Sequence, residues 1–285
     1  MCKFFSGLAF KNGDIHYNLM TDSHEDLIIE KGLDDSSDLS SVRRNWVRFE
    51  YTSDSLSDLS TYELRIDENT VPIWCDDDYK NALIGKLQPI IKAMILCDVE
   101  KKILVGGCWI LTGGSIIDRC VSARIVLMDK SSNVGEMWGS SNVGEMWGSS
   151  NVGEMRGSSN VGEMWESSNV GEMWESSNVG VMRGSSNVGE MWGSSNVGEM
   201  RESSNVGEMW GSSNVGVMRG SSKVGEMRES SKVGVMRGSS NVGVMRGSSN
   251  VGEMRESSNV GEMWGSSNVG VMRGSSKVLK DNKVK

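Results

Sequence analysis

Sixteen uninterrupted copies of a nine-residue unit fill 131–274 of this 285-residue chain. The unit is Ser-Ser-(Asn/Lys)-Val-Gly-(Glu/Val)-Met-(Trp/Arg)-(Gly/Glu), and its positions one, two, four, five and seven are identical in every copy. Two serines, a glycine and a β-branched valine in each unit disfavour an α-helix, and nine is not a heptad-like period. Because so short a unit cannot bury an apolar face alone, the repeats predict a solenoid of stacked units.

The period of nine fits a flattened parallel β-solenoid in which two units form one 18-residue coil, so that 16 units make eight coils. Val and Met are the predicted core, Ser-Ser and Gly the predicted turns, and positions six and eight the outward side chains. A flexible tail is the alternative, since Ser and Gly make up a third or more of every unit. Calcium-binding nonapeptide repeats need an Asp in each unit, and this array has none, which excludes calcium.

The residues before the repeats predict a small α+β head. Asn12-Gly13 between two apolar runs indicates a β-hairpin, and Asp22 or Ser23 can cap a short helix. We further predict strands over 46–52 and 62–67, and a helix after 76–78 that Pro89 should kink or divide. The fold class is therefore mainly β, with a head over 1–101, a β-rich cap over 102–130, the solenoid over 131–274 and a basic tail over 275–285.

The cysteines and the apolar segments indicate the cellular compartment of the protein. The five cysteines all precede the repeats and include no Cys-x-x-Cys pair, which favours free thiols in a reducing compartment. The N-terminal residues lack a secretory signal, and the apolar stretches fall short of the roughly 18 to 20 residues of a membrane helix. We therefore expect a soluble protein in the cytoplasm of a bacterial host, with no membrane partner, cofactor or metal site.

Substitutions among the repeats are not independent of one another. Val at position six occurs only with Arg at position eight, and every Trp follows a Glu at position six. Repeats over 131–211 carry eleven acidic residues and three arginines, net −8, whereas 212–285 carry six acidic and twelve basic residues, net +6. Duplication history is the alternative explanation of such patterns, because 194–224 and 248–278 are identical over 31 residues.

The outward tryptophans and the basic residues of the distal half are the candidate binding groups. The charge asymmetry favours self-association or a protein partner. The indole rings could stack on sugars or pack on one another, and the lack of aromatics among the distal basic residues argues against a nucleic acid. The candidate binding residues are Trp138, Trp147, Trp165, Trp174, Trp192, Trp210, Arg237 and Arg246.

The start of the chain suggests an enzymatic alternative. Removal of Met1 would expose Cys2 as an N-terminal residue whose α-amine could act as base for the thiol, with His24 as a further partner. This start resembles the N-terminal-nucleophile amidotransferases and the enzymes that cross-link an N-terminal Cys to abasic DNA. The Gly that usually follows that Cys is replaced by Lys3, which places the resemblance in doubt.

Three segments together resemble a family of bacteriophage and gut-bacterial mobile-element proteins: Met-Cys-Lys-Phe-Phe-Ser-Gly-Leu-Ala-Phe-Lys-Asn-Gly-Asp at the start, Asp-Ser-His-Glu-Asp-Leu-Ile over 22–28, and the Ser-Ser-Asn-Val-Gly-Glu-Met repeats. The resemblance implies an origin in a mobile element and no particular activity. The array is also similar to pentapeptide-repeat and other bacterial β-solenoids in fold alone. We expect a non-enzymatic structural or interaction protein, with a small enzyme that uses Cys2 as the alternative.

Overall fold

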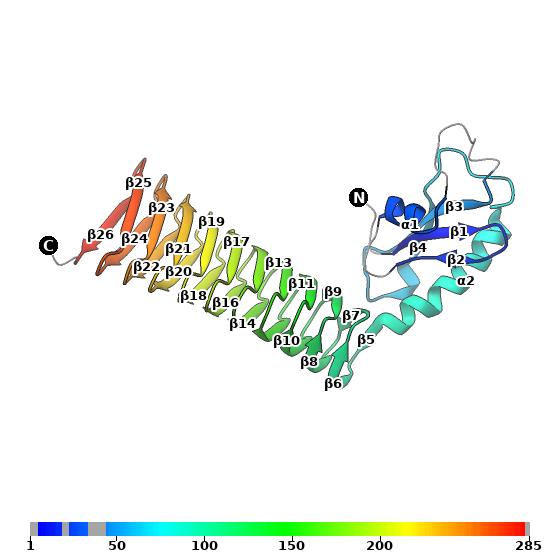
Figure 1. The fold of residues 1–285 in the computed structure, drawn as a ribbon, viewed down its shortest axis with the longest axis horizontal. Coiled ribbons are helices and arrows are strands. Elements are labelled where there is room, and N and C mark those ends of the chain that lie inside the picture. Colours follow the sequence, from blue (N-terminus) through cyan, green and yellow to red (C-terminus); the bar gives the residue numbers. More distant parts are fainter. Residues whose placement is uncertain (1–4, 19–22, 34–43, 283–285) are drawn as a thin grey trace. The chain divides into compact units, whose positions relative to one another are not determined.

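The computed structural model describes residues 5–18, 23–33 and 44–282 and divides the chain into two units, Met1–Leu96 and Cys97–Lys285 (Figure 1). The first unit contains an antiparallel sheet in the order β2-β1-β3-β4. Its strands are β1 (Ser6–Phe10), β2 (Ile15–His16), β3 (Trp46–Thr52) and β4 (Glu63–Ile66), and a short 3-10 helix, η2, spans Leu59–Thr61. The predicted hairpin is present, with Gly13 at φ +87° in its turn.

Among the described residues of this unit, two α-helices accompany the sheet, and both begin where the sequence predicts a helix. Helix α1 (His24–Glu30) starts after Ser23, whose side chain accepts a hydrogen bond from the Asp26 backbone N–H. Helix α2 (Asp77–Met94) starts after Asp76 and continues through Pro89 as one helix, so of the two outcomes predicted for Pro89, a kink or a division into two helices, the division is wrong. The proline removes a hydrogen bond to the carbonyl of Gly85, and both residues are exposed, so water can satisfy that carbonyl.

The second unit is the predicted parallel β-solenoid with two repeats in each 18-residue coil. Two sheets of 11 parallel strands alternate along the chain. One sheet contains β5 (Ile95–Cys97), β7 (Cys108–Thr112), β9 (Arg124–Met128), β11 (Asn142–Met146), β13 (Asn160–Met164), β15 (Asn178–Met182), β17 (Asn196–Met200), β19 (Asn214–Met218), β21 (Lys232–Met236), β23 (Asn250–Met254) and β25 (Asn268–Met272). The other contains β6 (Glu100–Val105), β8 (Ile116–Val121), β10 (Asn133–Trp138), β12 (Asn151–Met155), β14 (Asn169–Met173), β16 (Asn187–Met191), β18 (Asn205–Met209), β20 (Lys223–Met227), β22 (Asn241–Met245), β24 (Asn259–Met263) and β26 (Lys277–Asp281).

The coils extend beyond the repeats at both ends. Strands β5 to β9 form coils from non-repetitive sequence, in which Ile117 and Cys120 take the places of Val and Met. The solenoid thus begins before residue 102. Strand β26 pairs with β24, so part of the segment 275–285 also belongs to the sheet. No helix within the described ranges is long and apolar enough to cross a membrane.

The core between the two sheets consists of the Val and Met ladders, as predicted. In the first 15 repeats both side chains are at most 2% exposed, and the position-two serines in the corners are equally buried. Successive coils pair in register, Val on Val and Met on Met, about 4.8 Å apart. This ordered packing excludes the flexible-tail alternative for the described repeats.

Position five must be glycine because the coils approach too closely there for a side chain. A Cβ built on Gly189 would lie 2.5 Å from the carbonyl oxygen of Gly171 in the preceding coil, and the other position-five glycines have equivalent contacts of 2.4 to 2.7 Å. Two consecutive residues, at positions five and six, therefore face outward between the inward Val and Met. The invariance of this glycine has a steric cause besides any duplication history.

Tight turns and amide ladders complete each coil. The Ser150 N–H donates to the Trp147 carbonyl across a turn whose second residue, Gly148, has φ +68°. Every Glu at position nine also has a positive φ, which side chains other than Gly rarely adopt. At position three, Asn side chains donate along the stack, for example from Asn187 Nδ2 to Asn169 Oδ1 at 2.9 Å. Such ladders stabilise stacked parallel strands.

Candidate interaction surface of the solenoid

The outward side chains at positions six and eight lie on two opposite faces, because odd-numbered and even-numbered repeats build different sheets. We call the outer side of the sheet with β10 to β26 the glutamate face, and the outer side of the sheet with β11 to β25 the arginine face. The glutamate face carries an acid at position six in six successive coils: Glu136, Glu154, Glu172, Glu190, Glu208 and Glu226. The arginine face carries a base at position eight in six successive coils: Arg183, Arg201, Arg219, Arg237, Arg255 and Arg273.

The two ladders are staggered along the solenoid axis. The six glutamates occupy coils one to six of the repeat array, and the six arginines occupy coils three to eight. The change from acidic to basic along the sequence occurs on both faces, because the arginine face begins with Glu145 and Glu163 and the glutamate face carries Arg228 and Arg246 in coils six and seven.

Tryptophan and glutamate are linked by a hydrogen bond within the repeat. The indole Nε1 of Trp192 donates to Oε2 of Glu190 at 2.9 Å, and the same bond forms in five further repeats at 2.6 to 3.1 Å. Trp165 is the exception, because its indole N–H has no hydrogen-bond acceptor among the described residues. The carboxylate of its own repeat, Glu163, pairs with Arg183, with Oε2 3.7 Å from the arginine Nε. This bond explains why every Trp follows a Glu at position six.

The tryptophans form two columns of parallel rings. Trp147 and Trp165 stack with ring centroids 4.9 Å apart on the arginine face. On the glutamate face Trp192 lies between Trp174 and Trp210, at 5.2 and 4.8 Å, with 7° between the ring planes. Both faces of the Trp192 indole are thus covered, and only its edge is outward. A sugar ring, which needs a free aromatic face, could not stack there.

Arginines extend these columns by lying over the end rings. Arg183 is 4.3 Å from the centroid of Trp165, and Arg228 is 4.1 Å from that of Trp210. Arg156 lies between Trp138 and Trp174, at 5.4 and 6.0 Å. Cation–π contacts therefore occupy ring faces that the tryptophans leave open.

Arginine pairs with glutamate in two different ways. Where position six is Glu, the Arg pairs within its own repeat, as Arg201 does with Glu199 at 2.6 Å. Where position six is Val, the Arg reaches the glutamate of the preceding coil, as Arg219 does with Glu199 at 2.5 Å and Arg246 with Glu226 at 2.7 Å. Arg183 and Arg273 follow the second pattern. Four of the five arginines that accompany Val at position six thus pair with a glutamate of the preceding coil.

Arg237 departs from that pattern, because both its own repeat and the repeat of the preceding coil have Val at position six, Val235 and Val217. Among the described residues it forms no ion pair. Its charge contributes to lowering the pKa of Glu253 without direct contact. On the other face, Glu190 accepts from Trp192 but has no cationic partner in the described chain. Glu172 accepts from Trp174 and has no ion pair among the described residues either, so the glutamate ladder has two such residues and the arginine ladder has one, Arg237.

The structure separates the residues that the sequence grouped as one binding set. Trp147, Trp165 and Arg237 lie on the arginine face. The remaining candidates, Trp138, Trp174, Trp192, Trp210 and Arg246, lie on the glutamate face. Sequence reasoning missed the two glutamate and arginine ladders, although sorting the repeats into odd and even copies would have shown them.

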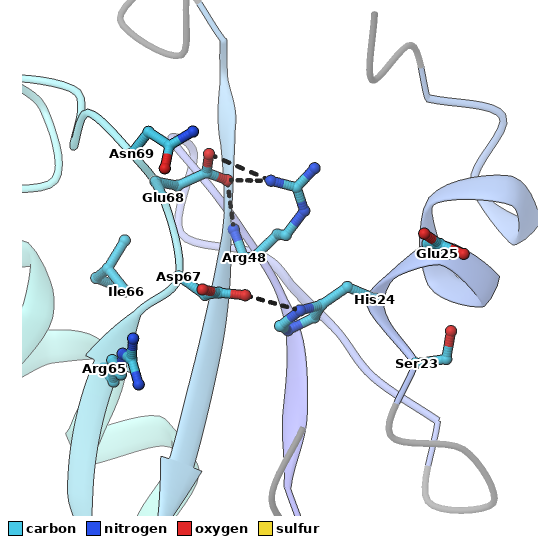
Figure 2. Close-up of a pocket in the computed structure, with 9 residues that line it drawn as sticks. All are labelled: Ser23, His24, Glu25, Arg48, Arg65, Ile66, Asp67, Glu68 and Asn69. Carbon is cyan, nitrogen blue, oxygen red and sulfur yellow. Dashed lines mark hydrogen bonds and ion pairs between the residues drawn. The ribbon is translucent and has the colours of Figure 1, made fainter. Parts of the chain in front are cut away.

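The head contains an open polar pocket at the ends of β3 and β4 (Figure 2). Glu68, whose side chain is 4% exposed, accepts from the Arg48 backbone N–H at 3.1 Å and pairs with the Arg48 and Arg44 guanidinium groups. Figure 2 shows His24 pointing from α1 toward Asp67. The buried carboxylate of Glu68 holds the segment after β4 against β3.

His24 is engaged at both ring nitrogens. Its Nδ1 lies 3.4 Å from an Asp67 carboxylate oxygen, and its Nε2 lies 3.0 Å from the carbonyl oxygen of Phe49. A carbonyl oxygen only accepts, so Nε2 carries a hydrogen in that bond. A general base needs a free ring nitrogen near the nucleophile, and this placement gives His24 a structural role between α1 and the sheet. Cys2 lies outside the described residues.

The described thiols are poorly suited to nucleophilic chemistry. Burial raises the pKa of Cys108 to about 11 and that of Cys120 to about 12. Cys97 is exposed, but a hydrogen bond to the Asp98 carboxylate raises its pKa. The described residues contain no group of three or more His, Cys, Asp or Glu that could hold a metal ion.

Comparison with known proteins identified no relative. No family model matches the sequence, and neither the curated proteins nor the solved structures include a significant match to it.

Proposed function

We propose that this chain is a non-enzymatic structural or interaction protein whose solenoid presents a repeating surface to protein partners. One observation carries the proposal: variation among the repeats is confined to outward or corner positions, while the buried Val and Met and the crowded Gly stay fixed. The variable side chains at positions six and eight are ordered by hydrogen bonds, ion pairs and ring stacking. An interaction surface of this kind is fixed before binding, which lowers the entropic cost of association.

The size and regularity of the surface also favour binding to an extended partner. Each coil adds one row of polar and aromatic groups about 4.8 Å from the last. Solenoids commonly use such extended surfaces for recognition. A partner that contacts several rows would therefore gain affinity with the number of coils.

The experiment compares full chains that differ by whole coils. A variant that lacks 203–238 removes two coils and preserves the alternation of the two sheets. The wild type, this variant and a Cys2→Ala variant are immobilised at equal density, and the proteins that each retains from a soluble extract are quantified by mass spectrometry. We expect retention to fall in the shortened chain and to remain unchanged in Cys2→Ala. Retention that is unaffected by the loss of two coils would overturn the proposal.

A further inference from the structure

The ladders on the two faces of the solenoid have the same spacing, the same length and opposite charge. Both repeat once per coil, because each coil contributes one strand to each sheet. The six glutamates on one face can pair one to one with the six arginines on the other. We propose that the arginine face of one copy binds the glutamate face of a second copy, side by side with parallel solenoid axes. This proposal rests on the proposed function and identifies one partner for it.

A stagger of two coils, about 9.6 Å along the axis, aligns the two ladders completely. The glutamates occupy coils one to six and the arginines coils three to eight. In this register each glutamate of one copy faces one arginine of the other. The pairs, glutamate first, are Glu136 and Arg183, Glu154 and Arg201, Glu172 and Arg219, Glu190 and Arg237, Glu208 and Arg255, and Glu226 and Arg273.

The direction of the strands makes the side-chain types complementary as well. The chain reverses at each corner, so strands in the two sheets of one coil run in opposite directions. When one copy is shifted sideways onto another, the facing strands are therefore antiparallel, and a further shift along the strand direction places position eight of one over position six of the other. Arg237 then faces Glu190, and Val235 faces Trp192. An ion pair and an apolar contact form in the same row.

The row of Arg237 and Glu190 joins two charges that form no ion pair in the described part of the chain. The other five ladder arginines pair within the chain. Of the other ladder glutamates, all but Glu172 do so, as Glu154 does with Arg156. A contact between two copies gives Arg237 and Glu190 each a partner. A stagger of three coils would pair Arg237 with Glu172 but matches only five rows, so the two-coil register is favoured.

Because the two contacting faces differ, the contact does not close on itself. Each copy in a pair still has one free face, and a third copy can add to it. The expected assembly is therefore a row of solenoids that grows with protein concentration and weakens with added salt, because its specificity comes from outward charges.

The test uses full-length protein and four variants in sedimentation-velocity experiments between about 5 and 200 µM, at about 50 mM and 500 mM NaCl. The variants are Arg237→Glu, Glu190→Arg, the double variant with both changes, and Lys277→Glu. Lys277→Glu makes the same change of charge as Arg237→Glu but lies exposed in β26, the strand after coil eight, outside the six matched rows. Circular dichroism confirms that each variant retains its β structure.

At low salt the wild type should exceed the 31.1 kDa monomer mass as concentration rises, and should return toward it at high salt. Arg237→Glu and Glu190→Arg should each reduce the associated fraction at least severalfold. The double variant should recover association, because its two faces are again complementary. Lys277→Glu should associate as the wild type does.

Three results would overturn the proposal: a wild type that stays monomeric, equal losses in Arg237→Glu and Lys277→Glu, or no recovery in the double variant. None of them bears on the coil-deletion experiment, which measures retention of other proteins. If that retention still falls with coil number, the proposed function stands and only the self-association is wrong.

Discussion

Trp192 donates its indole N–H to the carboxylate of Glu190, two residues earlier, and its two ring faces are covered by the tryptophans of the adjacent coils. The residue at position eight thus depends on the residue at position six, both within the repeat and along the stack. The repeats use three residue pairs at these positions, Glu with Trp, Glu with Arg and Val with Arg, and in the first two the side chain at position eight contacts the Glu of its own repeat.

The first prediction tests this dependence at one row. Glu190→Val should destabilise the solenoid by about 1 kcal/mol, because the Trp192 N–H loses its acceptor. Glu190→Val combined with Trp192→Arg restores a natural pair, and the new Arg can reach Glu172 in the preceding coil. The double variant should therefore be more stable than the sum of the single changes by about 0.5 kcal/mol or more. Urea unfolding of all four proteins measures this coupling, and additive changes would contradict the prediction.

The second prediction concerns the close approach of the coils at position five. Gly189→Ala should lower the free energy of unfolding by about 1 to 3 kcal/mol, because its Cβ would lie 2.5 Å from the Gly171 carbonyl oxygen and the backbone must shift. Ser194→Ala, an exposed position in the next repeat, is the matched control and should change stability by less than about 0.5 kcal/mol. Equal free energies of unfolding for the two variants would show that the backbone can accommodate the added methyl group without losing stability.

The main features of the solenoid follow from the sequence because they depend on short-range periodicity. Val and Met recur at fixed spacing, and only stacking can bury both. The strand Trp46–Thr52 was also predicted correctly, and the caps are Ser23, one of the two residues that the sequence allowed, and Asp76, the first of the three predicted acids, since alternation and capping are local properties. The sequence did not decide between a kink and a division at Pro89, because that depends on whether the freed carbonyl faces water.

The binding surface could be predicted only in part. The outward direction of positions six and eight follows from the repeat, but the grouping of residues into faces depends on which repeats are neighbours in space. Arg237 and Arg246 belong to adjacent repeats and lie on opposite faces, whereas Arg237 and Arg219 are 18 residues apart and lie in adjacent coils. The covering of the Trp192 ring likewise results from stacking, which a linear sequence does not display.

The third prediction is the pH dependence of the ion pairs. The hydrogen bond from Arg201, together with the charges of Arg201 and Arg219, lowers the pKa of Glu199 from its ordinary value of 4.5. A carboxyl with a lowered pKa in the folded state contributes stability that is fully present above about pH 4.5 and is lost as the pH falls through the folded-state pKa. Glu199→Gln should therefore lose less stability than the wild type between pH 7 and pH 3 in urea unfolding.

Ser194→Ala is again the control, because the change is outward and not titratable, and it should follow the wild type at every pH. An identical pH dependence for Glu199→Gln and the wild type would show that these ion pairs do not contribute to stability.

The last prediction concerns thiol reactivity in the folded chain. Cys97 is exposed, and its Sγ lies 3.3 Å from the Asp98 carboxylate, which raises its pKa by accepting the thiol hydrogen and by its negative charge. Since the thiolate is the reactive form, Asp98→Asn should increase the labelling rate of Cys97 severalfold at pH 7.5. Cys108 and Cys120 should remain unlabelled until the protein is unfolded, because both are buried. Peptide mass mapping after timed alkylation separates the sites, and an unchanged Cys97 rate in Asp98→Asn would show that the carboxylate does not control this thiol.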